Sequence, residues 1–283
     1  MYRLIYFFGL FILPFNNIVS QETDSLARIT YIANEGFLVE TTSHKLIIDG
    51  LFGNLNGDWC EQPGDSISDY MMNGTVPFND IEILLVTHNH TDHFNEAMVT
   101  SFMVKHTGTV LICPEQVNEV LKVNKSYPIF SERIISTGAD MDSVININGV
   151  KIVPVPVHHG SYMEIDTVTG KSYDLHSHIQ NNAYILKIGG FTLFHSGDGS
   201  SKNIQEYKGY FSGNDNIDIA MMDKQFLRAE GMQIINELIK PENLILMHIA
   251  PSQTEYFSKM VEAIPEIFVF KEKMESKIYK KDN

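Results

Sequence analysis

The segment Thr87–Phe94, which reads THNHTDHF, constrains the fold of this chain more than any other feature. It contains His88, His90, Asp92 and His93, and it directly follows the apolar run 83–86, which predicts a buried strand. Imidazoles and carboxylates are the usual ligands of zinc and similar divalent metals. His88 and His90 lie two positions apart, so they share one side of an extended segment. Asp92 and His93 follow once the chain turns, so they can face a second metal.

Further candidate ligands also follow short apolar runs that predict strands. The later runs and the residues after them are 153–157 with His158 and His159, 191–194 with His195 and Asp198, and 244–247 with His248. An earlier aspartate, Asp49, follows the run 46–48. Because a strand end is a rigid platform, these side chains can be directed toward one point.

This order of motifs resembles that of the metallo-β-lactamase-fold metallohydrolase superfamily, over roughly residues 28–270. The resemblance implies an α/β fold, a four-layer αβ/βα sandwich in which two packed mixed β-sheets carry outer helices. The entry strand 34–39 and the His-Ser-Gly-Asp motif at 195–198 are similar to the branch with ascorbate-6-phosphate lactonase-like and N-acyl phosphatidylethanolamine phospholipase D-like proteins. The motifs depart from those of class B β-lactamases and of glyoxalase II, which argues against lactam and thioester hydrolysis.

The resemblance also implies a ligand set for two divalent metal ions. The first ion would be held by His88, His90 and one histidine of the pair 158–159, the second by Asp92, His93 and His248, with Asp198 bridging both. Zinc is the expected metal, with manganese or iron as alternatives, because nitrogen and oxygen ligands discriminate poorly among them. A metal-bridging hydroxide would be the nucleophile, and Asp92 would carry a proton to the leaving group. His195 is a second catalytic candidate, through a hydrogen bond that orients a ligand.

Spacing alone does not decide which of His158 and His159 is the ligand. A strand alternates its faces, so only one of two neighbours can point at the metal. Counted from Pro156, a Pro-x-x-His pattern favours His159 and a Pro-x-His pattern favours His158; we expect His159 and keep both as candidates. Among the other polar residues, Asp49 is expected to orient a ligand or the strand ends. His176 and His178 are expected to be solvated, with contact to substrate as the alternative.

These patterns predict an exported dinuclear metal-dependent hydrolase that acts on a small-molecule ester, lactone, amide or phosphodiester. Two other classes stay open: an iron-dependent oxygenase or oxidoreductase with the same ligands, and a non-catalytic metal-binding protein. The latter would be marked by a lost ligand, and the set is complete. The net charge of −14 at pH 7 argues against non-specific binding of nucleic acid or anionic membranes. The expected partner is a small-molecule substrate, and the oligomeric state is left open.

The N-terminus is typical of a secretory signal peptide at residues 1–20, with an apolar stretch over 4–15 and a small residue, Ser20, before the cleavage point. An uncleaved anchor is the alternative, although this stretch is short for a membrane span. We therefore predict one hydrolase domain over residues 21–283, periplasmic or secreted, with no stable membrane insertion after cleavage. Export permits a disulfide between Cys60 and Cys113, but Cys113 ends an apolar run and is expected to pack as a small hydrophobe.

Hydrophobic patterning gives a coarse order of elements. Two hairpins are predicted, over 28–40 with 45–49 and over 182–188 with 191–195, followed by single strands and helices. The single strands are 133–136, 143–148, 151–157 and 217–222, and the helices are 95–105, 114–122, 231–239 and 255–263. The Gly-, Asn- and Pro-rich stretch 51–80 is expected to form a lid or wall of the site. The charged tail 271–283 is expected to fray.

Overall fold

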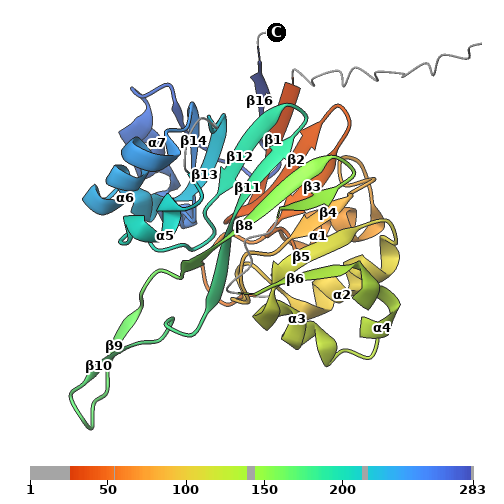
Figure 1. Ribbon diagram of the computed structural model, residues 1–283, viewed down its shortest axis with the longest axis horizontal. Coiled ribbons are helices and arrows are strands. Elements are labelled where there is room, and N and C mark those ends of the chain that lie inside the picture. Colours follow the sequence, from red (N-terminus) through yellow and green to blue (C-terminus); the bar gives the residue numbers. More distant parts are fainter. Residues whose placement is uncertain (1–25, 54, 139–143, 212–215, 282–283) are drawn as a thin grey trace, which may run out of the picture.

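Two seven-stranded mixed sheets pack face to face, and helices cover the outer face of each (Figure 1). The computed structural model describes residues 26–53, 55–138, 144–211 and 216–281. These layers confirm the expected αβ/βα sandwich. The predicted signal peptide, 1–20, lies outside the described residues. None of the described helices has the length and apolar character needed to cross a membrane.

The first sheet has the strand order β16-β1-β2-β3-β4-β5-β6. Its strands are β1 (Leu26–Ala33), β2 (Gly36–Thr41), β3 (Lys45–Ile48), β4 (Ile83–Leu85), β5 (Val110–Pro114), β6 (Ile134–Thr137) and β16 (Ser276–Lys280). Its outer helices are α1 (Asp65–Asn73), α2 (Glu96–Lys105), α3 (Glu115–Lys122) and α4 (Tyr127–Phe130), with a 3-10 turn at Ser131–Arg133. Because β3, β4, β5 and β6 run parallel, their carboxyl ends meet at one edge of the sheet.

The second sheet has the order β15-β14-β13-β12-β11-β8-β7. Its strands are β7 (Ile145–Ile147), β8 (Val150–His158), β11 (Gln180–Ile188), β12 (Phe191–His195), β13 (Ile219–Asp223), β14 (Asn243–Met247) and β15 (Ile267–Val269). Its helices are α5 (Ile204–Lys208), α6 (Ala229–Ile234), which continues as a π-helical turn over Ile235–Ile239, and α7 (Thr254–Val261), with 3-10 turns at Lys224–Leu227 and Pro251–Gln253. Strands β12 to β15 are parallel. A separate hairpin of β9 (Met163–Ile165) and β10 (Ser172–Asp174) projects from the body between β8 and β11 (Figure 1).

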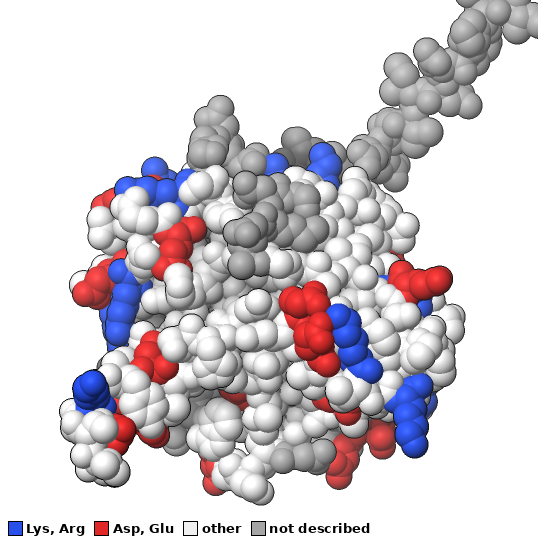
Figure 2. Space-filling model, turned by 60° about the horizontal axis from the view of Figure 1, so that its bottom comes forward, with Lys and Arg blue, Asp and Glu red and all other residues white. Residues whose placement is uncertain are grey.

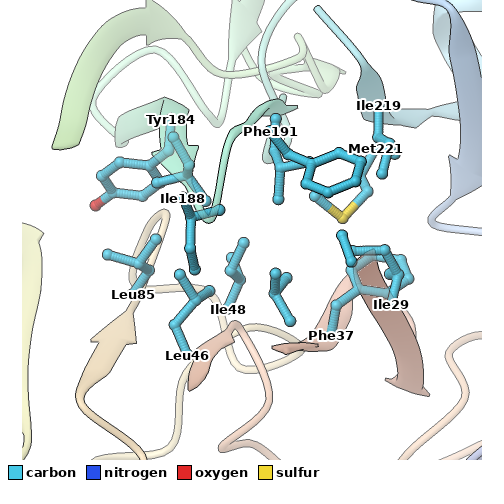
Figure 3. Packing of buried hydrophobic residues seen from close by; sticks show 14 of the residues in the cluster. Ile29, Phe37, Leu46, Ile48, Leu85, Tyr184, Ile188, Phe191, Ile219 and Met221 are labelled. Carbon is cyan, nitrogen blue, oxygen red and sulfur yellow. The ribbon is translucent and has the colours of Figure 1, made fainter. Parts of the chain in front are cut away.

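Strand alternation divides the apolar side chains between a central layer and two outer layers. Leu46 and Ile48 of β3 face the second sheet, where they share a core with Tyr184 and Ile188 of β11 (Figure 3). Ile47, between them, belongs to the core under the helices of the first sheet. Successive side chains of a strand point to opposite faces, so one continuous apolar run supplies two layers. This arrangement brings the carboxyl ends of β4 and β12 to the same end of the sandwich.

Most of the predicted elements are confirmed, with small shifts at their ends. The predicted strand 28–40 is wrong as a single strand, because a turn at Asn34 and Glu35 divides it into β1 and β2, which pair antiparallel. The helix predicted over 95–105 starts at Glu96, because Asn95 is its N-cap and accepts a hydrogen bond from the Met98 amide. The stretch 51–80 contains α1, which was not predicted. Before α1, Phe52 and Cys60 pack against Ala33, next to the turn between β1 and β2. Cys60 and Cys113 are both buried and free.

The expectation that the charged tail frays is wrong for residues 276–280. These residues form β16, which pairs antiparallel with β1, with Ile278 opposite Arg28. The Tyr279 ring is 7% exposed and belongs to the central core. One buried aromatic residue and one strand ladder therefore hold a segment whose composition alone is typical of a mobile end.

The substitution Tyr279→Ala should lower the free energy of unfolding by about 3 kcal/mol, because it removes a buried ring and leaves a cavity. The matched control, Tyr70→Ala, changes a tyrosine that is 49% exposed and should alter stability by less than about 0.5 kcal/mol. Urea denaturation of both variants measures the difference. Equal stability of the two variants would contradict the docked tail.

Candidate metal centre

Polar side chains from both sheets meet at the end of the sandwich where β4, β8, β12 and β14 finish. The backbone there is unusual, since Asn34, Asp49 and His248 adopt positive φ angles of 51°, 43° and 56°. Such left-handed conformations are uncommon for residues other than glycine and concentrate at functional sites. Gly197, with φ 49°, also requires its residue type, because a Cβ atom would lie 2.7 Å from Asn181 Oδ1. The loop after β12 can therefore bring Asp198 close to β4.

One group of candidate ligands consists of His88, His90, His159 and Asp198, each offering one ligand atom within 4.8 Å of the others. The His159 Nε2 atom lies 3.1 Å from Asp198 Oδ2 and 3.3 Å from His88 Nε2. His88 is fully buried, and His90 is partly exposed at the mouth. The structure thus brings together four residues that lie on β4, β8 and β12 or directly after them.

Hydrogen bonds to the other ring nitrogens determine the tautomers of His88 and His159. The Thr87 hydroxyl donates its proton to Asp49 Oδ2 at 2.5 Å, so it can only accept at 3.0 Å from His88 Nδ1. His159 Nδ1 lies 2.8 Å from the Gly160 carbonyl, which accepts only. Both Nδ1 atoms therefore carry the proton, and two Nε2 lone pairs face each other across 3.3 Å. Facing lone pairs repel unless a cation lies between them.

A second group consists of Asp92, His93 and His248, again with ligand atoms within 4.8 Å of one another. His93 Nδ1 lies 2.8 Å from Asp49 Oδ2, so Nδ1 carries a proton and Nε2 is the nitrogen that a metal would bind in the neutral ring. That Nε2 atom lies 3.5 Å from both Asp92 Oδ2 and Asp198 Oδ1. His93 Nε2 and Asp198 Oδ1 are buried and have no hydrogen-bond partner among the described residues. Nitrogen and oxygen atoms that face one another in this way, without hydrogen-bond partners, fit the ligand set of a divalent cation.

Asp198 lies between the two groups, with Oδ2 toward His159 and Oδ1 toward His93 and His248. Burial by itself would raise the pKa of Asp198, but the charges of His248 and His93 hold this pKa well below its ordinary value. Burial lowers the pKa of His88 well below its ordinary value, and burial with nearby His159 lowers that of His90 to about 4. These imidazoles are neutral at pH 7, and this is the form that binds metal.

The structure separates His158 from the other candidate ligands. Its side chain is 78% exposed and lies 3.0 Å from Glu206, on the outer side of β8. The strand continues into His159, which bridges to Gly199, so the alternation of faces turns His159 inward and His158 outward. The inclusion of His158 among the candidate ligands was therefore wrong.

The assignment of His195 as a catalytic residue is also wrong. The ring is fully buried; Nε2 lies 3.0 Å from the Glu35 carbonyl and Nδ1 accepts from the Gly197 amide. Both nitrogens are thus occupied by backbone groups, and no substrate can reach them. His195 instead fixes the turn between β1 and β2 relative to the loop that carries Asp198.

His176 lies closer to the site than the sequence indicated. Its ring centroid is 4.4 Å from that of His159 and 4.7 Å from that of His90, and its Nδ1 lies 2.9 Å from the Gly160 carbonyl. His178 stands apart, and its backbone carbonyl accepts from Gln116. The base of the β9–β10 hairpin therefore forms one wall beside the first group.

Two buried acids near the second group, Glu35 and Asp223, were missed in the sequence. Each can offer a ligand atom within 4.8 Å of those of Asp198 and His248. Asp223 directly follows the apolar run of β13, the same signal that identified Asp49, so it could have been found. Glu35 lies in the turn between β1 and β2, where nothing in the sequence distinguishes it from a solvated turn residue.

Comparison with known proteins identifies the family of this chain. The family model described as the beta-lactamase superfamily domain matches residues 68–269. The chain belongs to this family. A UPF0173 metal-dependent hydrolase of Methanosarcina mazei is 26% identical over 248 residues, which cover 83% of this chain and 91% of the relative.

Two solved structures share the fold at low identity. Isothiocyanate hydrolase from Delia radicum gut bacteria has a TM-score of 0.58 at 14% identity and covers 90% of this chain and 100% of its own. The diiron β-hydroxylase CmlA of Streptomyces venezuelae has a TM-score of 0.56 at 9% identity and covers 90% of this chain and 54% of its own. A hydrolase and a β-hydroxylase therefore both occur among the structural neighbours of this chain.

Glu35 should destabilise the protein when metal is removed. Both carboxylate oxygens are buried without a hydrogen-bond partner among the described residues, and burial, with the Asp198 charge, raises the pKa of Glu35 well above its ordinary value. Because its pKa is raised in the folded state, Glu35 lowers the free energy of unfolding only where the unfolded chain would be ionised. This loss of stability is absent below the unfolded-state pKa of about 4.3 and grows as the pH rises.

The variant Glu35→Gln should therefore unfold at a higher temperature than the wild type in EDTA at pH 8, by roughly 2 to 8 °C. The gain should be smaller at pH 5, where more of the wild-type carboxyl is protonated. Thermal denaturation of both proteins at the two pH values measures it. A variant that is less stable than the wild type at both pH values would contradict this account.

Proposed function

We propose that this metal-dependent hydrolase of the metallo-β-lactamase superfamily holds two divalent ions and cleaves an ester, lactone, amide or phosphodiester of a small molecule. His88, His90 and His159 would hold one ion, and Asp92, His93 and His248 the other. Asp198, with one oxygen toward each group, would contact both. One observation carries the proposal: the hydrogen bonds to Nδ1 of His88, His159 and His93 direct their Nε2 atoms at one another or at carboxylates.

The charges support two ions rather than one. Each group gathers ligand atoms that need a cation or a proton between them, and Asp198 lies between the two groups. Buried polar groups without partners cost about 1–3 kcal/mol each, and more when they are charged. One cation in the first group would leave His93 Nε2, Asp92 and one oxygen of Asp198 uncompensated. In the metal-free protein a proton on His93 supplies part of that compensation, since its pKa, which burial would lower, is raised well above normal by Asp92 and Asp198.

Bound divalent ions lower the pKa of a coordinated water and neutralise charge on the attacked group. The protein side chains supply the remaining steps. Asp92 is held by the Asn34 side-chain amide, which donates at 3.3 Å to Oδ2, and is 6% exposed. This carboxylate stays ionised at the edge of the site, because the charge of His93 more than offsets the effect of burial on its pKa. We assign Asp92 to carry the proton to the leaving group.

Zinc is the metal that we propose, because tetrahedral and five-coordinate nitrogen and oxygen sites suit it. The same ligand types also accept iron or manganese, and an iron-dependent oxygenase is the competing assignment. The likeness to CmlA concerns the fold alone. Metal analysis with a substrate panel separates the two, since iron without hydrolysis of any ester, lactone or phosphodiester would favour oxygen chemistry.

A small-molecule substrate is proposed from the surface around the site. The chain has a net charge of −14. Figure 2 brings forward the side from which the β9–β10 hairpin projects, and on it Lys, Arg, Asp and Glu are scattered without a continuous basic area. Long polyanions are bound by extended basic surfaces, so this face does not suit nucleic acid. We further propose that residues 1–20 direct export and that residues 21–283 act as one domain outside the cytoplasm.

Neighbouring histidines provide a matched test of the site. His159→Ala should lower the bound metal by about one equivalent and reduce hydrolysis by more than about 100-fold, since removing a ligand costs more than removing a ligand's partner. His158→Ala should keep both metal content and activity, because that ring points to solvent. Elemental analysis and turnover of 4-nitrophenyl acetate, bis(4-nitrophenyl) phosphate and a lactone measure both properties. The assignment fails if His158→Ala loses metal and His159→Ala does not.

A further inference from the structure

A hollow of about 300 Å³ adjoins the metal centre on the side of the second sheet. One wall is the turn that follows β13, with Lys224, Gln225 and Arg228; the other is α7, with Tyr256, Phe257 and Met260. The hollow belongs to neither group of candidate ligands, so its chemistry can be considered separately.

The hollow is joined to the metal centre through two of its lining residues. Lys224 Nζ donates to the His248 carbonyl oxygen and lies 3.4 Å from His248 Nδ1. On the other side, the Gln225 side-chain nitrogen lies 3.7 Å from the Cβ position at Gly160, directly after His159. Two residues that line the hollow therefore also lie beside the ligand groups.

The charge of the hollow is opposite to that of the chain. Lys224 and Arg228 line it, and no acidic residue does among the described residues, although the protein as a whole carries −14. The Arg228 guanidinium makes no side-chain hydrogen bond or ion pair with the described part of the chain. Two cations beside an opening attract and bind anionic oxygen groups, and arginine does so with a planar pair of donors.

The opposite wall is apolar and exposed. Tyr256 is 65% exposed and Met260 43%, and the Tyr256 ring meets Phe257 edge-on with centroids 5.2 Å apart. Large apolar side chains that are exposed and lie next to one another often mark a binding site. A ligand with an anionic group and an apolar body would contact both walls.

We propose that this hollow is the subsite for an anionic group, a carboxylate or a phosphate, carried on an apolar part of the substrate. Arg228 and Lys224 bind the anionic oxygens, α7 contacts the apolar part, and the scissile bond lies over the metal centre. The inference rests on the proposed hydrolase function and adds its substrate class. It makes Arg228 a specificity-determining residue, and it assigns Lys224 a second role besides holding the His248 carbonyl.

Kinetic preference for an anionic substrate tests the proposal. The wild type should hydrolyse the 4-nitrophenyl monoester of succinic acid, which carries a free carboxylate, with a higher kcat/KM than uncharged 4-nitrophenyl butyrate. In Arg228→Met the ratio of the two kcat/KM values should fall by about tenfold, the effect of losing one charged hydrogen bond. Lys208→Met, which removes an exposed lysine on α5 that does not line the hollow, should keep the ratio. An unchanged ratio in Arg228→Met would overturn the proposal.

Direct binding separates this proposal from the hydrolase function. Benzoate and inorganic phosphate are titrated into metal-free protein, so that neither anion can bind to a metal, and heat is measured by calorimetry. At least one should bind to the wild type and to Lys208→Met, with about tenfold weaker binding to Arg228→Met. If the anions bind in this way but the wild type hydrolyses no substrate, the anion subsite is retained and the proposed function is rejected. Equal binding by all three proteins, or binding of neither anion, would reject the subsite whatever the wild type hydrolyses.

Discussion

The buried carboxylate of Asp49 is the group on which the geometry of the site depends. It is 1% exposed and accepts from the Thr87 amide at 2.8 Å, the Thr87 hydroxyl at 2.5 Å and His93 Nδ1 at 2.8 Å. Through the Thr87 hydroxyl it also determines the tautomer of His88. Hydrogen bonds to a charged group contribute about 1.5–3 kcal/mol each. One carboxylate therefore orients the rings of His88 and His93, one in each ligand group. A residue that hydrogen-bonds to a metal ligand in this way controls how that ligand binds metal.

The fold explains why one residue can do this. Asp49 follows β3 and Thr87 follows β4, and these strands are parallel neighbours in register from Leu46 with Ile83 to Ile48 with Leu85. The carboxyl ends of these two strands are therefore adjacent, because the strands are paired in parallel. The second sheet presents β12, β13 and β14 in parallel as well, and packing of the central core brings the two sets of strand ends together. Ligands bind at the carboxyl ends of strands because loops there can vary without disturbing the sheet.

The layers and most of the candidate site were predicted through the resemblance to a known family, and that resemblance rests on short motifs in a fixed order along the chain. An apolar run followed within a few residues by a histidine or aspartate indicates a strand and a candidate ligand together, as for His88, Asp198 and His248. The failures involve contacts between residues far apart in the chain. His159 rather than His158 turns inward because it bridges to Gly199, and β16 is ordered because β1 offers it an edge. Glu35 is an exceptional case, since a turn glutamate becomes a buried acid only when the second sheet closes over it.

Buried acidic side chains concentrate around the second ligand group. The second ligand group contains Asp92, and three further acids, Asp198, Asp223 and Glu35, lie close to it. Positive charge at this position is therefore stabilised. The central claim is that two metal ions supply this positive charge, one on either side of Asp198. Anomalous diffraction at the zinc absorption edge, from crystals of zinc-loaded protein, tests it most directly. The account predicts two peaks ~3.5–4 Å apart, one beside His88, His90 and His159 and one beside Asp92, His93 and His248. A single peak at the first group, or none, would contradict it.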